Sequence, residues 1–175
     1  MSRAALAVLI GIVISTSLVE RTHAQPAAAR ALPVPATLNQ LMRGTLYPAS
    51  NIVFAAQDLD PANVPRAKDP SMATDLLTSS YGKWEAVENS ALAMTELAEL
   101  LTLPGRTCAN GVDVPVKNPD WVKFVQELRD AGMSAYAAAK AKDQDKMIEV
   151  SDVLANACMH CHIKYREKKF ADRCK

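Results

Sequence analysis

Residues 83–103 read KWEAVENSALAMTELAELLTL, and this stretch decides the class of fold. Its apolar side chains recur three and four positions apart, the spacing of one face of an α-helix. The same alternation is typical of the seam along which helices pack in a bundle. The helix could begin as early as Met72, and Pro104-Gly105 predicts its end. The predicted seam comprises Trp84, Val87, Ala91, Met94, Ala98 and Leu101.

Three further stretches show helical periodicity. The first spans 38–56, and Pro48 inside it predicts a kink, because proline lacks the N–H that a helix needs. The third helix of the chain, after that of 83–103, begins at Asn118, a good N-cap residue, which is followed by proline at the first helical position. After a short junction at 142–145, the fourth carries apolar positions up to Tyr165. Four helices with mostly short connections predict an all-α protein, an antiparallel up-down-up-down four-helix bundle.

Residues 158–162 read CMHCH, which is the attachment signature of c-type haem. In such a site the thiols of Cys158 and Cys161 add across the haem vinyl groups, and His162 coordinates the iron. The spacing places these three side chains toward one side of a helix. A redox pair, half a zinc site and a disulfide are the alternatives, but the pattern is not βαβ and no second pair of zinc ligands is present. The motif predicts one covalent haem c, with His162 as the proximal ligand.

The N-terminus has the pattern of a secretory signal peptide, with a short basic start and an apolar run over 4–19. Thr22-His23-Ala24 supplies a small-x-small cleavage site, so we expect residues 1–24 to be removed and 25–175 to form one domain. The apolar run is shorter than the ~20 residues that a membrane-spanning helix needs. The mature protein is therefore predicted to be periplasmic and to lack a membrane span.

Basic and acidic residues are almost balanced, with 20 Lys and Arg against 19 Asp and Glu. A nucleic-acid-binding protein would show a basic excess, so that class is excluded. The balance also gives no sign of a strongly charged redox partner. Only 5% of the residues are aromatic and alanine is frequent, which favours closely packed helices.

With these residues the chain resembles the class II c-type cytochromes, the family of cytochrome c-prime and its methionine-ligated relatives. The haem motif lies near the C-terminus and continues as IKYR at 163–166, which matches the family's C-x-x-C-H-x-x-aromatic-R ending. Residues 39–43, NQLMR, resemble the Leu-Met-Lys stretch of the low-spin members. The resemblance implies that Arg166 lies near the proximal imidazole or a haem propionate; a solvated surface arginine is the alternative. An extra cysteine pair and Pro48 depart from the family pattern.

The sixth iron ligand would decide what the haem does. His23 leaves with the signal peptide and His160 lies inside the attachment loop, which leaves no second histidine ligand. In an antiparallel bundle, Met42 near the start of the first helix lies at a similar depth to His162, about two turns from its helix end. Periodicity alone favours a core methionine at Met42. The family resemblance implies that Met42 is the distal ligand.

His/Met ligation raises the haem potential and leaves no open position, which suits electron transfer. The chain is then expected to be an exported mono-haem electron carrier, not an enzyme, with redox proteins as its partners. If Met42 does not reach the iron, a five-coordinate haem could take up NO or CO, as in the c-prime members proper. A haem peroxidase is the third option, disfavoured because the chain offers no distal histidine. The resemblance also implies a homodimer, in which two copies pair through their first two helices.

Cys108 and Cys174 are the two cysteines that the haem would not use. Export would place them in an oxidising compartment, where disulfides persist. The loop after the second helix and the end of the fourth helix lie at one end of an antiparallel bundle, so these residues predict an intramolecular disulfide. Two unpaired thiols, or an intermolecular bridge through Cys174, are the alternatives.

Overall fold

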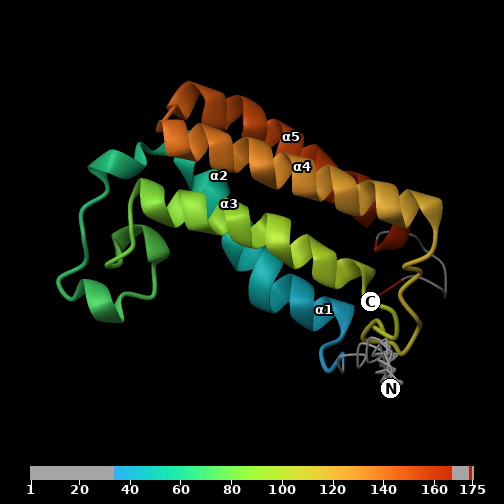
Figure 1. Ribbon diagram of the computed structural model, residues 1–175. Helices are drawn as coiled ribbons and strands as arrows, with labels where there is room; N and C mark the ends of the chain where they lie inside the picture. Colours follow the sequence, from blue (N-terminus) through green and yellow to red (C-terminus); the bar gives the residue numbers. More distant parts are fainter. Residues whose placement is uncertain (1–33, 167–173, 175) are drawn as a thin grey trace, which may run out of the picture. The chain divides into compact units, whose positions relative to one another are not determined.

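The computed structural model describes residues 34–166 and 174, and the predicted signal peptide, 1–24, lies outside them. The regular elements of the described residues are helical (Figure 1). No helix in this part of the chain is both long and apolar enough to cross a membrane. The main elements are α1 (Leu38–Leu41), the π-helical turn η1 (Met42–Leu46), α2 (Tyr47–Asp58), α3 (Trp84–Glu99), α4 (Pro119–Ala141) and α5 (Gln144–Tyr165).

The elements α1, η1 and α2 follow one another without a gap and form the first helix. This helix, α3, α4 and α5 form an antiparallel up-down-up-down bundle, which confirms the predicted fold. Helix α2 packs against α3, α3 against α4 and α4 against α5, and α5 returns to α2 (Figure 1). The seam predicted from 83–103 is buried at every position. The interior also holds large side chains from the other three helices, among them Val53, Trp121, Met147 and Leu154. Apolar periodicity thus selects the faces that form the core.

Helix α3 begins at Trp84, and the earlier start at Met72 is wrong. The connection from α2 instead contains three 3₁₀ turns: η2 (Pro61–Asn63), η3 (Pro70–Met72) and η4 (Leu76–Thr78). Each follows an aspartate whose carboxylate accepts a backbone N–H two residues later, and such side chains compete with helix formation. Lys83, with a φ of 63°, then lies in the left-handed region that an α-helix does not use.

The first helix runs through Pro48 without a break, and it widens just before the proline, at the place where the sequence predicts a kink. The Tyr47 N–H donates to the Met42 carbonyl oxygen, five residues earlier, which closes the π-helical turn η1. Pro48 has no N–H to donate to the Gly44 carbonyl, and in a regular helix its ring would press on that carbonyl. A wider turn is one of the few ways in which a helix can absorb such a residue.

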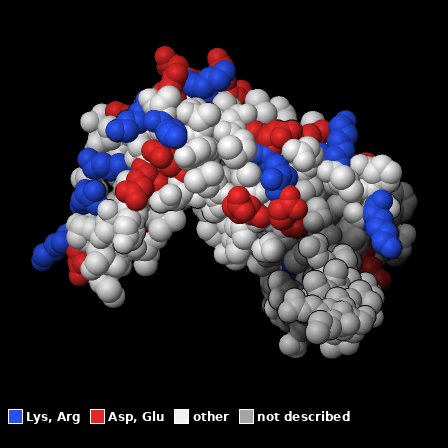
Figure 2. Space-filling view, viewed as in Figure 1, with Lys and Arg blue, Asp and Glu red and all other residues white. Residues whose placement is uncertain are grey.

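Charged side chains are mixed on the surface. Figure 2 shows Lys and Arg interspersed with Asp and Glu over the face that it presents. Arg129 of α4 forms an ion pair with Glu99 of α3, and this contact joins two neighbouring helices. On this face, therefore, the near-neutral composition corresponds to a surface on which positive and negative side chains are mixed.

Helices α3 and α4 pack closely where Thr95 meets Gly132. A Cβ atom added at Gly132 would lie 2.4 Å from Thr95 Oγ1 and 3.2 Å from the Ala91 carbonyl oxygen. The Thr95 hydroxyl donates to that same carbonyl at 3.2 Å, which fixes its position. The contact leaves no room for a methyl group at residue 132.

We expect Gly132→Ala to lower the free energy of unfolding by about 1–3 kcal/mol, because the cost of overpacking exceeds the stabilisation that alanine gives through its higher helix propensity. Gly44→Ala is the matched control, since nothing lies within 4 Å of a Cβ at this exposed site. The control should be neutral or stabilising. Urea denaturation measures both variants, and a Gly132→Ala protein as stable as the wild type would contradict the close contact.

Candidate functional site

The residues of the motif at 158–162 lie on two faces of α5. Cys158, Cys161 and His162 are half-buried, whereas the two residues between the cysteines are exposed. Positions three and four apart share a face because one helical turn holds 3.6 residues. Both cysteines also pack against the buried core. The three residues that haem attachment needs therefore form one stripe beside the core, and the spacer residues face away from it.

Cys158 and Cys161 are free thiols in this structure. Burial raises the pKa of both, and raises that of Cys161 to about 12, with a smaller contribution from the charge of Cys158. Desolvation penalises the thiolate, so both groups are neutral thiols at pH 7. A redox-active C-x-x-C pair requires the opposite, a lowered pKa that generates an attacking thiolate. The environment of the two thiols thus disfavours the redox alternative.

His160 points toward α4. Its Nδ1 atom lies 2.8 Å from Glu127 Oε2, and its ring centroid lies 6.3 Å from that of Phe124. This position is on the exposed side of α5, away from the stripe of Cys158 and His162. Among the described residues, His162 is the half-buried histidine.

The end of α5 is attached to the start of α4 by contacts that the sequence did not predict. The Tyr165 hydroxyl donates to Asp120 Oδ1 at 2.7 Å, and Lys164 forms an ion pair with the same carboxylate. The Tyr165 ring also packs edge-on against Trp121, with 5.0 Å between centroids. Antiparallel α4 and α5 bring a first-turn aspartate to the same end of the bundle as a last-turn lysine and tyrosine. Topology gives this shared end, but the rotation of α4 relative to α5 decides the pairing. These contacts fix the helical turn that contains His162.

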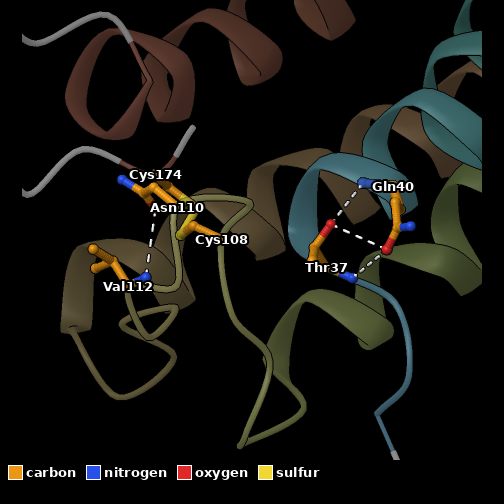
Figure 3. Close-up of a disulfide and its surroundings, with 6 residues drawn as sticks. All are labelled: Thr37, Gln40, Cys108, Asn110, Val112 and Cys174. Atoms are coloured by element: carbon orange, nitrogen blue, oxygen red, sulfur yellow. Dashed lines mark hydrogen bonds between the residues drawn. A yellow bond between two sulfur atoms is a disulfide. The ribbon is translucent and has the colours of Figure 1, made fainter.

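The predicted disulfide between Cys108 and Cys174 is present, with 5.0 Å between the two Cα atoms (Figure 3). Cys108 lies in the loop after α3 and is only 1% exposed. Its N–H donates to the Val112 carbonyl oxygen at 2.8 Å, which closes a tight turn. On the other side, the Cys174 N–H donates to the Tyr165 carbonyl oxygen at 3.1 Å. The bridge therefore ties Cys174 to the loop after α3, and the hydrogen bond ties Cys174 to the end of α5, one turn after His162.

The start of the first helix lies at this same end of the bundle. The Leu38 N–H donates to the Thr107 carbonyl oxygen at 2.8 Å, in the residue that precedes Cys108. The Thr37 capping box, in which Gln40 N–H bonds to the Thr37 hydroxyl, begins the helix beside the disulfide loop (Figure 3). A continuous series of contacts thus joins the beginning of α1 to the end of α5, as the antiparallel prediction requires.

Met42 is the half-buried methionine near this end, and it packs against the core. The other described methionines are either fully buried or exposed. Met94 and Met147 fill the core, while Met72, Met133 and Met159 are 78%, 46% and 42% exposed. Met72 belongs to the connection between α2 and α3. The structure brings Met42 and His162 to one end of the bundle, and their binding to one iron stays a prediction.

No family model, no curated protein and no solved structure matches this chain. A four-helix bundle alone implies no particular activity, so the chemistry and placement of the site residues are what indicate a function.

Proposed function

We propose that this chain is an exported electron carrier that holds one haem c through Cys158, Cys161 and His162. The observation that carries the proposal is the placement of these residues. Two neutral, free thiols and one imidazole share a half-buried stripe of α5, while the spacer residues face outward. These residues would hold the haem at the border between the core and the surface.

The chain's own groups have distinct tasks in this proposal. Each thiol would add its S–H across one vinyl group, forming one C–S bond and passing the hydrogen to the neighbouring carbon, so nothing is released. The imidazole of His162 would bind the iron in its neutral form. When bound, the haem iron supplies a one-electron couple between its ferric and ferrous states. Tyr165 and Asp120 would keep the last turn of α5 in place, because their 2.7 Å hydrogen bond joins it to α4.

Met42 is the proposed distal ligand. A thioether sulfur in the sixth position raises the potential and closes the iron to other ligands, which favours electron transfer over gas binding. Support comes from its half-buried position and from the shared end of the bundle described above. A five-coordinate, gas-binding haem protein is the alternative if Met42 does not reach the iron.

We expect Met42→Ala to convert the ferric protein from low-spin to high-spin. The ferrous variant should bind CO at least about tenfold more tightly, because the sixth position is no longer filled in most molecules. Absorption spectra with and without CO measure both effects. Met159→Ala is the matched control, since this exposed methionine lies in the haem motif itself but faces away from the core. A wild-type protein that is already high-spin would favour the gas-binding alternative.

Export and the partner class follow from the same proposal. Haem attachment at this motif and a persistent disulfide both suit an oxidising compartment outside the cytoplasm. The disulfide between Cys108 and Cys174 supports this localisation. The proposed partners are redox proteins that deliver and accept single electrons, and a homodimer through the first two helices stays a prediction.

A further inference from the structure

The π-helical turn η1 begins at Met42, the residue proposed to bind iron. The turn spans Met42–Leu46, and the Tyr47 N–H closes it by donating to the Met42 carbonyl oxygen. Pro48 follows directly. The Thr45 hydroxyl donates to the Leu41 carbonyl oxygen, which a regular α-helix would offer to the backbone N–H of residue 45. Both the backbone and a side chain therefore take part in the widened turn.

The π-turn decides which side chains of this helix enter the core. Leu41 and Leu46 are both buried, although they are five positions apart. In a regular α-helix such residues point about 140° apart, whereas a turn with one extra residue brings them onto one face. Met42 lies beside Leu41 and is only half-buried. The extra residue thus places Leu41 at the centre of the buried face and Met42 at its flank.

A regular helix through the same sequence would reverse this arrangement. Met42 and Ala49 are seven residues apart, so they would point within about 20° of each other in an unbroken α-helix. Ala49 is buried in the bundle interior. Removing the extra residue would turn Met42 by about 100° relative to α2, toward the centre of the core, and would turn Leu41 away from it. A sulfur atom moved through such an angle could not keep one metal ligand position.

We propose that Pro48 positions Met42 as the distal ligand by enforcing the π-turn. The inference rests on the proposed His/Met function and adds the residue that sets the direction of the ligand. Pro48 is exposed, and its side chain has no donor atom that could bind the iron. It acts through the backbone, because it removes the hydrogen bond to the Gly44 carbonyl and disfavours the narrower turn. It is therefore a positioning residue.

Pro48→Ala tests the inference, with two measurements on the protein as purified. A crystal structure of the variant should show a regular turn, in which Tyr47 N–H bonds to the Arg43 carbonyl oxygen instead of that of Met42. The ferric spectrum should change from low-spin toward high-spin, and the ferrous form should bind CO at least about tenfold more tightly than the wild type. Thermal stability should stay equal or rise, since alanine suits a helix interior better than proline. A merely structural role for Pro48 would change only the stability.

Pro119→Ala is the matched control. Pro119 occupies the first position of α4, where its missing N–H removes no helical hydrogen bond, so its replacement should leave the spectrum unchanged. A Pro48→Ala protein that keeps the π-turn, or one that loses it and stays fully low-spin, overturns the inference. In both cases a spectral change in Met42→Ala would still support His/Met ligation. A spectrum unchanged in Met42→Ala would instead contradict the ligation itself, and the positioning role with it.

Discussion

A chain in which alanine replaces both Cys158 and Cys161 is expected to contain no covalently bound haem. These are the two free thiols of the described residues, and both lie on the stripe that includes His162. Without them no thioether bond can form, and any remaining haem would be held by iron ligation and packing alone. Extraction with acidified acetone separates the two cases, because it removes non-covalent haem and leaves thioether-linked haem on the protein.

The matched control removes the other cysteine pair. Cys108→Ala/Cys174→Ala also lacks two cysteines, but these form the disulfide and not the stripe on α5. This variant should retain its haem after extraction. Retention of haem by the Cys158→Ala/Cys161→Ala chain would show that attachment does not depend on the motif.

The second large effect concerns stability. We expect Cys108→Ala/Cys174→Ala to lose about 4 kcal/mol of unfolding free energy, because the bridge closes a loop between residues 66 apart and restricts the unfolded chain. Part of the loss should be local, since Cys174 also donates a hydrogen bond to the Tyr165 carbonyl oxygen. Urea denaturation of the wild type and the variant, both carrying haem, measures the difference.

Reductant supplies an independent check of the same prediction. A thiol reductant opens the disulfide but leaves thioether bonds intact, so the reduced wild type should lose the same stability as the double variant while keeping its haem. A loss below about 1 kcal/mol in both experiments would contradict a stabilising bridge of this loop length. A disulfide-linked dimer that separates on reduction would contradict the intramolecular pairing.

The sequence predicts the bundle well because its helices have clear apolar faces. The seam from Trp84 to Leu101 is buried as expected, and Asn118 and Pro119 mark the start of α4 correctly. The disulfide is also predictable, because antiparallel topology places a loop and a tail at one end. These inferences need only periodicity, breaker residues and the direction of the helices.

The π-turn could not be predicted from the same information. Leu41 and Met42 are both apolar, so either could face the core at that point of the first helix. The choice depends on the balance between a clash at Pro48, the cost of a wider turn and the burial of Leu46. Periodicity contains none of these energies. The sequence therefore predicts a disturbance near Pro48 but not its form.

The contacts of Asp120 and Glu127 escaped prediction for a different reason. Both are acidic residues on α4 that resemble any surface carboxylate in sequence, yet one binds Tyr165 and the other His160. Their partners lie more than 30 positions away, and the pairing depends on the rotation of α4 relative to α5. Only the packed bundle fixes that rotation.

The mass of the intact wild-type protein, after denaturation and acid-acetone extraction, tests the central proposal most directly. The protein should be produced with its N-terminal segment in cells that attach haem c. We expect a single chain heavier by the mass of one haem, with the added mass on the peptide that contains Cys158 and Cys161. A chain of unmodified mass, with both of these thiols open to alkylation, would contradict it.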